Sequence, residues 1–168
     1  MFHFFMVRLR YTYFLDGLMN FKLLLILTIF ALHISSQAAT ILLLDPCTGD
    51  VVLNESLVVT KDMTLGEMTV NAFDKLDIEY IGSNMGMNTI LGTPTGLEAM
   101  DIVARDEMYA YGWCFTINGE LAEVYPDKVI LSESDKVIWS YGFAHYLRGK
   151  WFGQCTSSLN RPASFCHE

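Results

Sequence analysis

Covalent chemistry in this chain would depend on cysteine and histidine side chains. After residue 38 the sequence holds four cysteines and two histidines: Cys47, Cys114, Cys155, Cys166, His145 and His167. A Cys155 thiol deprotonated by the His145 imidazole could attack a carbonyl carbon. None of the cysteines forms a C-x-x-C pair, which is the spacing typical of zinc and thioredoxin-like redox sites. The spacing therefore favours structural cysteines over reactive ones.

Other catalytic signatures are missing from the sequence. It contains no G-x-S-x-G, H-E-x-x-H or P-loop motif, and no dinucleotide-binding glycine pattern. Two acidic groups lack the alternating order of a calcium loop; they are Asp101, Asp106 and Glu107, and Glu120, Glu123 and Asp127. We therefore expect a protein that is not an enzyme, with no catalytic residue and no metal site.

Aromatic side chains are the residues best suited to bind a ligand. Residues 109–152 contain eleven of the fourteen aromatic residues that follow residue 38. Such side chains pack in cores or stack on flat ligands, and loops on a rigid sheet are common binding sites. Both interpretations stay open for the six candidate binding residues, which are Trp113, Trp139, Tyr141, His145, Tyr146 and Trp151. We expect residues 145–152 to form a loop, where Arg148 and Lys150 could pair with carboxylates or phosphate.

Disulfide bonds are the other use of the cysteines. An even number in an exported chain favours a disulfide framework, which here has three connectivities. We favour Cys114–Cys155 because both cysteines lie beside the aromatic segment, and we place Cys47–Cys166 second as a tie between the termini. Free buried thiols are the alternative.

The elements that position these residues begin with strands and a helix. Runs rich in β-branched residues predict strands at 40–44, 51–53 and 57–59. Thr64 and Glu67 then form a capping-box pattern. One face of a helix is predicted by the spacing of Leu65, Met68, Ala72, Phe73 and Leu76.

The next segment repeats this order. Short strands are predicted at 78–81 and 89–91, each followed by turn residues. Thr95 and Glu98 repeat the capping-box pattern, so we expect a second short helix within residues 95–105.

The last third of the sequence has the period of β-strands. Side chains alternate over 109–116, and Asn118-Gly119 is a strong hairpin signal. Further strands are predicted at 129–131 and 136–143. The whole pattern predicts an α+β fold with one or two helices on a mixed or antiparallel sheet.

Residues 1–38 have the composition of an export leader. Lys22 precedes the apolar run 23–34, and Ser36 and Ala38 are small residues where a signal peptidase requires them. The run is shorter than the roughly 20 apolar residues that span a bilayer. We therefore expect a signal peptide, a true start at Met19 and a secreted, extracellular or periplasmic protein with no stable membrane span after cleavage. The alternative is that this segment is not cleaved and stays as a membrane anchor.

Residues 39–168 are acidic and show no sign of a domain boundary. Eight basic against eighteen acidic residues give residues 39–168 a net charge of −10, and the full chain carries −8. This balance excludes a nucleic-acid binder, which needs a basic face to displace counterions from phosphates. We expect one domain over 39–153, followed by a cysteine-containing tail over 154–168.

Two motifs in the aromatic segment resemble a known family. They are Trp113-Cys114-Phe115-Thr116-Ile117-Asn118-Gly119 and Ser134-Asp135-Lys136-Val137-Ile138-Trp139-Ser140-Tyr141. Together they resemble the W-x-x-x-x-N-G and G-D-x-V-x-W-x-Y pattern of the transcobalamin-like C-terminal domain family, domain of unknown function 4430. The resemblance extends over residues 58–147. Ser134 replaces the usual glycine of the family, and residues 95–105 form an insertion.

The resemblance implies an exported, β-grasp-like module. In the vitamin B12 carriers of this family, the related domain closes over one face of a bound corrinoid. The resemblance therefore implies cobalamin as a candidate ligand, and His145 could supply a nitrogen to its cobalt. We predict a non-catalytic module that binds a small molecule or a surface partner. The alternative is a structural or adhesive cell-surface module that contacts protein or glycan.

Overall fold

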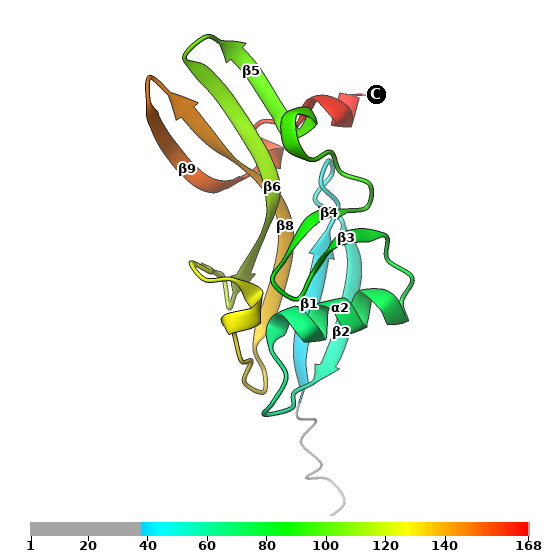
Figure 1. Cartoon of the computed structure of the whole chain (residues 1–168). Helices are drawn as coiled ribbons and strands as arrows, with labels where there is room; N and C mark the ends of the chain where they lie inside the picture. The colour runs from blue at the N-terminus through cyan, green and yellow to red at the C-terminus, as the bar shows by residue number, and fades with distance from the viewer. Residues whose placement is uncertain (1–37, 168) are drawn as a thin grey trace, which may run out of the picture. The chain divides into compact units, whose positions relative to one another are not determined.

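The main sheet has seven strands within residues 38–167, the part of the chain that the computed structural model describes (Figure 1). Its order is β2-β1-β8-β6-β5, with β7 beside β6 and β9 beside β8. The strands are β1 (Ala38–Leu44), β2 (Val51–Val58), β5 (Met100–Ala104), β6 (Glu107–Ile117), β7 (Glu120–Leu121), β8 (Lys136–Leu147) and β9 (Lys150–Ser157). Strands β1 and β8 are parallel, and the other pairs are antiparallel. The predicted mixed sheet is confirmed.

Helix α2 (Leu65–Lys75) packs on one face of this sheet. Its capping box is the predicted one: Thr64 Oγ1 accepts the Glu67 N–H at 3.3 Å, and the Glu67 carboxylate accepts the Thr64 N–H at 2.8 Å. The backbone hydrogen bond lowers the pKa of Glu67. The predicted stripe faces the sheet, with Met68 and Phe73 buried.

The core joins this helix to the central strands. Trp139 of β8 is 2% exposed and donates from its indole N–H to Thr69 Oγ1 of α2 at 3.3 Å. Ile41 and Val137, which pair across β1 and β8, are fully buried. Burying a side chain of this size stabilises a fold by about 1.5–3 kcal/mol. A β1–β2 hairpin, a helix and a central parallel strand pair form the α+β, β-grasp-like arrangement that was expected.

A second hairpin, β3 (Tyr80–Ser83) and β4 (Gly86–Ile90), follows the helix and forms its own two-stranded sheet. The Tyr80 ring lies 5.6 Å from the Phe73 ring of α2, measured between centroids. At the turn, a Cβ on Gly66 would overlap the carbonyl oxygen of Asn84. The missing side chain at Gly66 therefore lets the hairpin approach the helix.

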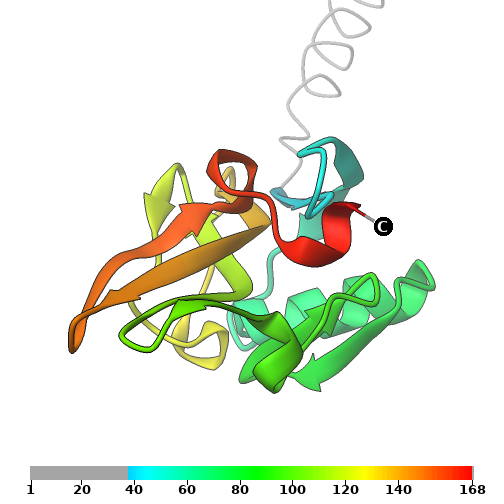
Figure 2. The same ribbon diagram turned by 90° about the horizontal axis from the view of Figure 1, so that it is seen from above.

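Strands β6 and β8 pair along the full length of β6, from Glu107–Leu147 to Ile117–Val137. They extend past the helix into a four-stranded region that we call the arm (Figures 1 and 2). The arm consists of β5, β9, residues 107–110 of β6 and residues 142–147 of β8.

The C-terminal segment covers one face of the sheet beside the arm. It contains the short 3-10 helices η3 (Ser158–Asn160) and η4 (Ser164–His167). Phe165 packs edge-on against Tyr141 at 5.8 Å between ring centroids, and the Arg161 guanidinium lies 4.0 Å from the centre of the Tyr109 ring. Ser158 donates to the Pro46 carbonyl at 2.8 Å, which attaches the segment to the β1–β2 turn.

The four cysteines form two disulfides, Cys47–Cys166 and Cys114–Cys155, the pairs favoured from the sequence. The second one joins β6 to β9 across β8. There the β9 backbone passes so close that a Cβ on Gly142 would lie 2.8 Å from the Thr156 carbonyl oxygen. Gly142 therefore permits the crossing that brings Cys155 to Cys114.

The predicted leader falls outside the described residues except for Ala38, the first residue of β1. Strand β9 runs across the boundary expected between residues 153 and 154. No helix among residues 38–167 is long and apolar enough to cross a bilayer.

The predicted second helix is wrong. Residues 96–99 form one 3-10 turn, η1, and β5 follows directly. Thr95 makes no side-chain capping hydrogen bond, and Leu97 is 80% exposed. The ladder between β5 and β6 satisfies the backbone groups that a helix would have paired internally, so tertiary pairing overrides the local pattern.

Two further expectations are corrected. Residues 129–131 form no strand; instead the Val129 carbonyl accepts the N–H of Leu65 at 2.8 Å, and Leu131 enters the core. Residues 145–152 are not a loop, because β8 and β9 continue to the two-residue turn Arg148-Gly149. Both turn residues have positive φ, as type I′ hairpins require.

We expect Gly66→Ala to lower the free energy of unfolding by about 1–3 kcal/mol, because the new methyl group collides with the Asn84 backbone. Alanine would otherwise favour a helix by roughly 0.5–1 kcal/mol. The exposed α2 variant Asn71→Ala is the control and should unfold at the wild-type urea concentration or above it. A Gly66→Ala protein as stable as wild type would contradict this packing.

Candidate functional site

Two of the six predicted binding residues belong to the core. Trp139 and Tyr141 are 2% and 3% exposed. Trp139 packs under α2, and Tyr141 lies against Phe165 of the C-terminal segment. Both residues therefore contribute to the core, because the helix and the C-terminal segment cover that face of the sheet, and Trp139 also lines the cleft described below.

His145 is engaged within the arm. Its ring stacks on Tyr109 at 4.3 Å between centroids, and its Nε2 lies 3.0 Å from a Glu107 carboxylate oxygen. The candidate nucleophile Cys155 is in a disulfide, so it has no thiol for His145 to deprotonate. No group of three or more histidine, cysteine or acidic side chains within residues 38–167 is placed to hold a metal ion.

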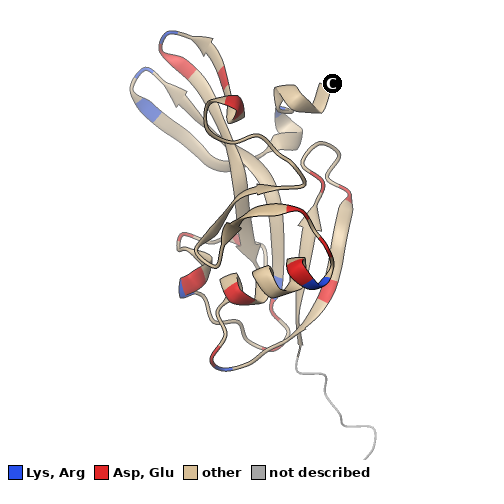
Figure 3. Ribbon diagram, turned by 45° about the vertical axis from the view of Figure 1, so that its right-hand side comes forward, with Lys and Arg blue, Asp and Glu red and all other residues tan. Residues whose placement is uncertain are grey.

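Tyr146 and Trp151 form a pair on the arm, with ring centroids 5.2 Å apart. Trp151 is 51% exposed, and β5 adds the exposed apolar side chain of Ile102. Arg148 and Lys150 lie in and after the adjoining turn, and Figure 3 shows basic residues at the tips of both arm hairpins. The acidic residues Asp106 and Glu107 lie beside these tips, so the arm is an exposed aromatic surface with charges of both signs.

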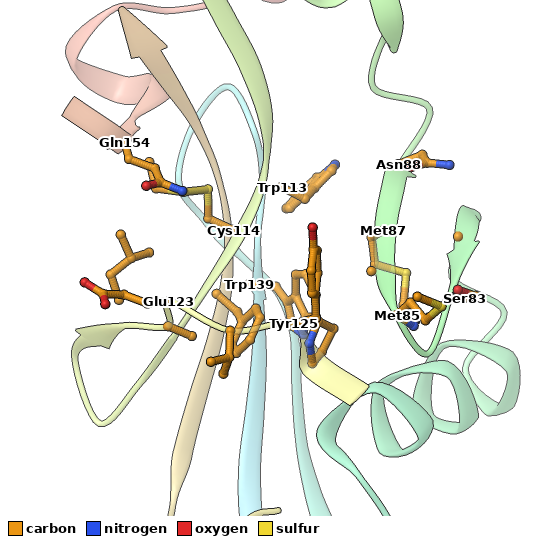
Figure 4. A pocket seen from close by; sticks show the side chains of 18 of the residues that line it. Ser83, Met85, Met87, Asn88, Trp113, Cys114, Glu123, Tyr125, Trp139 and Gln154 are labelled. Atoms are coloured by element: carbon orange, nitrogen blue, oxygen red, sulfur yellow. Dashed lines mark hydrogen bonds between the residues drawn. A yellow bond between two sulfur atoms is a disulfide. The ribbon is translucent and has the colours of Figure 1, made fainter. Parts of the chain in front are cut away.

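Trp113 lies elsewhere, beside a cleft of about 1060 Å³ that we call the β4–β6 cleft. Figure 4 shows Met87 across the cleft from Trp113, with Tyr125 below Trp113 in this view. The Trp113 indole N–H donates to Thr93 Oγ1 at 2.8 Å, which fixes the orientation of the ring. The structure thus separates Trp113 from the arm residues with which it was grouped.

The wall opposite Trp113 is the β3–β4 hairpin. It contributes Ile81, Met85 and Met87, of which Ile81 and Met85 are more than half exposed. Methionine side chains adapt their shape to the surface that they contact. This wall is therefore apolar and adaptable.

The third side is the segment from β7 to the 3-10 turn η2 (Pro126–Lys128). Leu121, Val124 and Tyr125 line the cleft and are 40%, 54% and 70% exposed. Glu123 is the one charged residue among the side chains that line the cleft. Five large exposed apolar side chains thus surround one hollow, which marks an interaction site more than scattered exposure would.

Most residues of this cleft carry no signal in the sequence. Exposure of Met85 and Tyr125 depends on where their segments pack, and no local periodicity encodes it. The available signal was limited to Met85 and Met87, which flank Gly86 directly after the predicted turn residues 82–84.

A family model described as Domain of unknown function (DUF4430) matches residues 97–142. The match runs from η1 into β8, so it covers β6 and the β7–η2 side of the cleft. A comparison with curated proteins finds no match. The chain is therefore similar to this family over the strands that border the cleft.

The motif residues in the matched region have structural roles. Asn118 donates to Asp135 at 2.8 Å and accepts the Lys136 N–H at 2.9 Å. Asp135 also accepts the Ser132 N–H at 2.7 Å. Ser134 has a φ of +71°, a backbone conformation that favours glycine. These residues fix the β6–β7 turn against the start of β8.

Tyr141 gives a test of the core assignment. Burial, and then the neighbouring Tyr111, raises the pKa of Tyr141 to about 12, and its hydroxyl has no hydrogen-bond partner within the described residues. Tyr141→Phe should keep or raise stability at pH 7, because an unpaired buried hydroxyl costs about 1–3 kcal/mol.

The pH dependence has a defined sign. The raised pKa of Tyr141 contributes to the free energy of unfolding. This contribution is complete below the ordinary pKa near 10 and is lost as the pH rises toward about 12. Urea unfolding between pH 7 and 12 should therefore show a shallower alkaline decline for Tyr141→Phe than for wild type. A large loss of stability at pH 7 would reveal a partner for the hydroxyl and contradict the assignment.

Proposed function

We propose that the protein is an exported, non-catalytic binding module and that its ligand occupies the β4–β6 cleft. The observation that carries this proposal is the convergence of exposed apolar side chains on one open hollow. Binding sites are commonly concave and mainly apolar, with a few polar groups that set orientation. The carboxylate of Glu123 and the side-chain amides of Asn88 and Gln154 provide such groups here.

Export is supported by the leader-like sequence and by the disulfides. Disulfides persist in oxidising compartments, and both pairs here join segments that are far apart in sequence. An extracellular or periplasmic location is therefore compatible with the fold. The non-catalytic part of the proposal is supported by the commitment of Cys155 to a disulfide and of His145 to Glu107.

A corrinoid is the ligand that the transcobalamin-like resemblance implies. The cleft offers Trp113 and Tyr125 for stacking on a flat ring, and Met85 and Met87 for apolar contact. His145 does not line the cleft, so a corrinoid bound there would not use it as the cobalt ligand.

A second candidate is an adhesive surface on the arm. It is favoured by the exposure of Ile102, Val103, Trp151 and Phe152, which are between 49% and 71% exposed at one end of the sheet. Such a surface would contact a protein or glycan. Variants on the cleft and on the arm distinguish the two candidates.

We expect cobalamin titrated into the disulfide-bonded protein to change its tryptophan fluorescence and the visible absorbance of the ligand. Tyr125→Ala should weaken binding by about five- to tenfold through loss of stacking. Tyr125 is 70% exposed, so its replacement spares the fold. Trp151→Ala, a matched aromatic deletion on the arm, should bind like wild type. Loss of cobalamin binding in Trp151→Ala alone would show that the site is on the arm. The absence of any signal at millimolar cobalamin would exclude a corrinoid.

A further inference from the structure

The outer edge of β6 is interrupted beside the β4–β6 cleft. On that edge the pairing of β6 with β5 ends at Ala110, and the pairing with β7 begins at Thr116. Within the described residues, no strand is paired with positions 111–115 on that side. Because the Phe115 carbonyl accepts the Ala122 N–H, the stretch of edge without a neighbour covers residues 111–114, about 14 Å at about 3.4 Å per residue.

The ladder registers show which backbone groups face this gap. Two backbone hydrogen bonds at the ends of the β6–β8 ladder join Asn118 to Lys136 and Arg148 to Asp106. They show that the backbone N–H and C=O groups of the even-numbered β6 residues point toward β8. On the opposite side, the Phe115 carbonyl accepts the Ala122 N–H at 3.1 Å. The backbone N–H and C=O groups of the odd-numbered β6 residues therefore point toward the outer edge. The N–H and C=O of Trp113 therefore point into the gap.

The lining of the cleft supports this geometry. Trp113 and Phe115 belong to the face of β6 that packs toward α2, whereas Cys114 and Cys155 lie on the other face. All four line the same hollow. Figure 4 shows the disulfide and Trp113 on opposite sides of the β6 ribbon. A hollow can touch both faces of a strand only where the edge of that strand is open.

We propose that the β4–β6 cleft binds an extended peptide segment of another protein, which adds to β6 as a strand opposite Trp113. An open strand edge gives a peptide main-chain hydrogen bonds, and pockets on the two faces select alternate side chains. When the peptide runs antiparallel to β6, its residue opposite Trp113 forms two hydrogen bonds with Trp113 and points its side chain toward Met87. The residues on either side of it point toward Gln154 and the disulfide.

This pattern defines the peptide. The side chain directed at Met87 is apolar, because it enters the hollow formed by Met85, Met87 and Tyr125. The flanking side chains are small and polar, because they lie beside the amide of Gln154. Glu123 is the one charged lining residue, so the cleft provides no counter-charge for an acidic peptide.

The inference rests on the proposed function in one respect, which is that the cleft is the binding site. The probe is a capped hexapeptide of alternating valine and threonine, added to the 15N-labelled, disulfide-bonded protein. We expect the Trp113 backbone amide to shift and its hydrogen exchange to slow at least about tenfold, since it gains a hydrogen bond. Tyr125→Ala should weaken binding, and Ile102→Ala on β5 should leave it unchanged.

Backbone methylation tests the hydrogen bonds directly. The valine residue opposite Trp113 donates its N–H to β6, whereas the threonine N–H groups point away from β6. A peptide N-methylated at its valines should lose binding, and one N-methylated at its threonines should bind within about twofold of the parent. Equal binding of the two methylated peptides would overturn strand addition.

The remaining outcomes separate the two proposals. If cobalamin binds in a Tyr125-dependent manner and the parent peptide does not bind, strand addition is overturned and the cleft remains a ligand site. If the peptide binds with the expected methylation pattern and cobalamin does not, strand addition is supported and the corrinoid is excluded. If neither binds up to millimolar concentration, both proposals fail.

Discussion

Antiparallel pairing between β6 and β8 is the interaction on which the other elements depend. One end of this ladder carries the core, where Trp139 packs under α2 and β8 pairs with β1. The other end carries the arm, where β5 and β9 add to its two edges. Because both strands are longer than the helix that covers them, one ladder supports two regions with different surroundings.

The cleft is a consequence of unequal strand lengths. Strand β6 spans eleven residues, but β5 and β7 have five and two residues and cover its ends. The centre of its outer edge therefore faces the β3–β4 hairpin across an open hollow. Soluble proteins usually cover or charge such edges. Here the centre of the edge lies between the β3–β4 hairpin and the β7–η2 segment, which both line the cleft.

Local signals predicted the elements whose stabilising contacts are close in sequence. The capping box at Thr64 and Glu67 and the Asn118-Gly119 turn formed as expected. The same box pattern at Thr95 and Glu98 failed, because the residues after it pair with β6 instead. The candidate site was predicted least well, since only Trp113 of the six proposed residues has a clear place beside the cleft and Trp139 contributes only to its buried floor.

The sequence by itself determined the α+β class, the amphipathic helix and the alternation of β6 and β8. These follow from residue spacing, which is a property of neighbours along the chain. Only the tertiary structure decided which aromatic residues are covered and where the sheet edge is open. Burial of Tyr141 depends on Phe165, and the gap beside Trp113 depends on where β5 and β7 stop. Exposure is set by segments distant in sequence, so no local pattern encodes it.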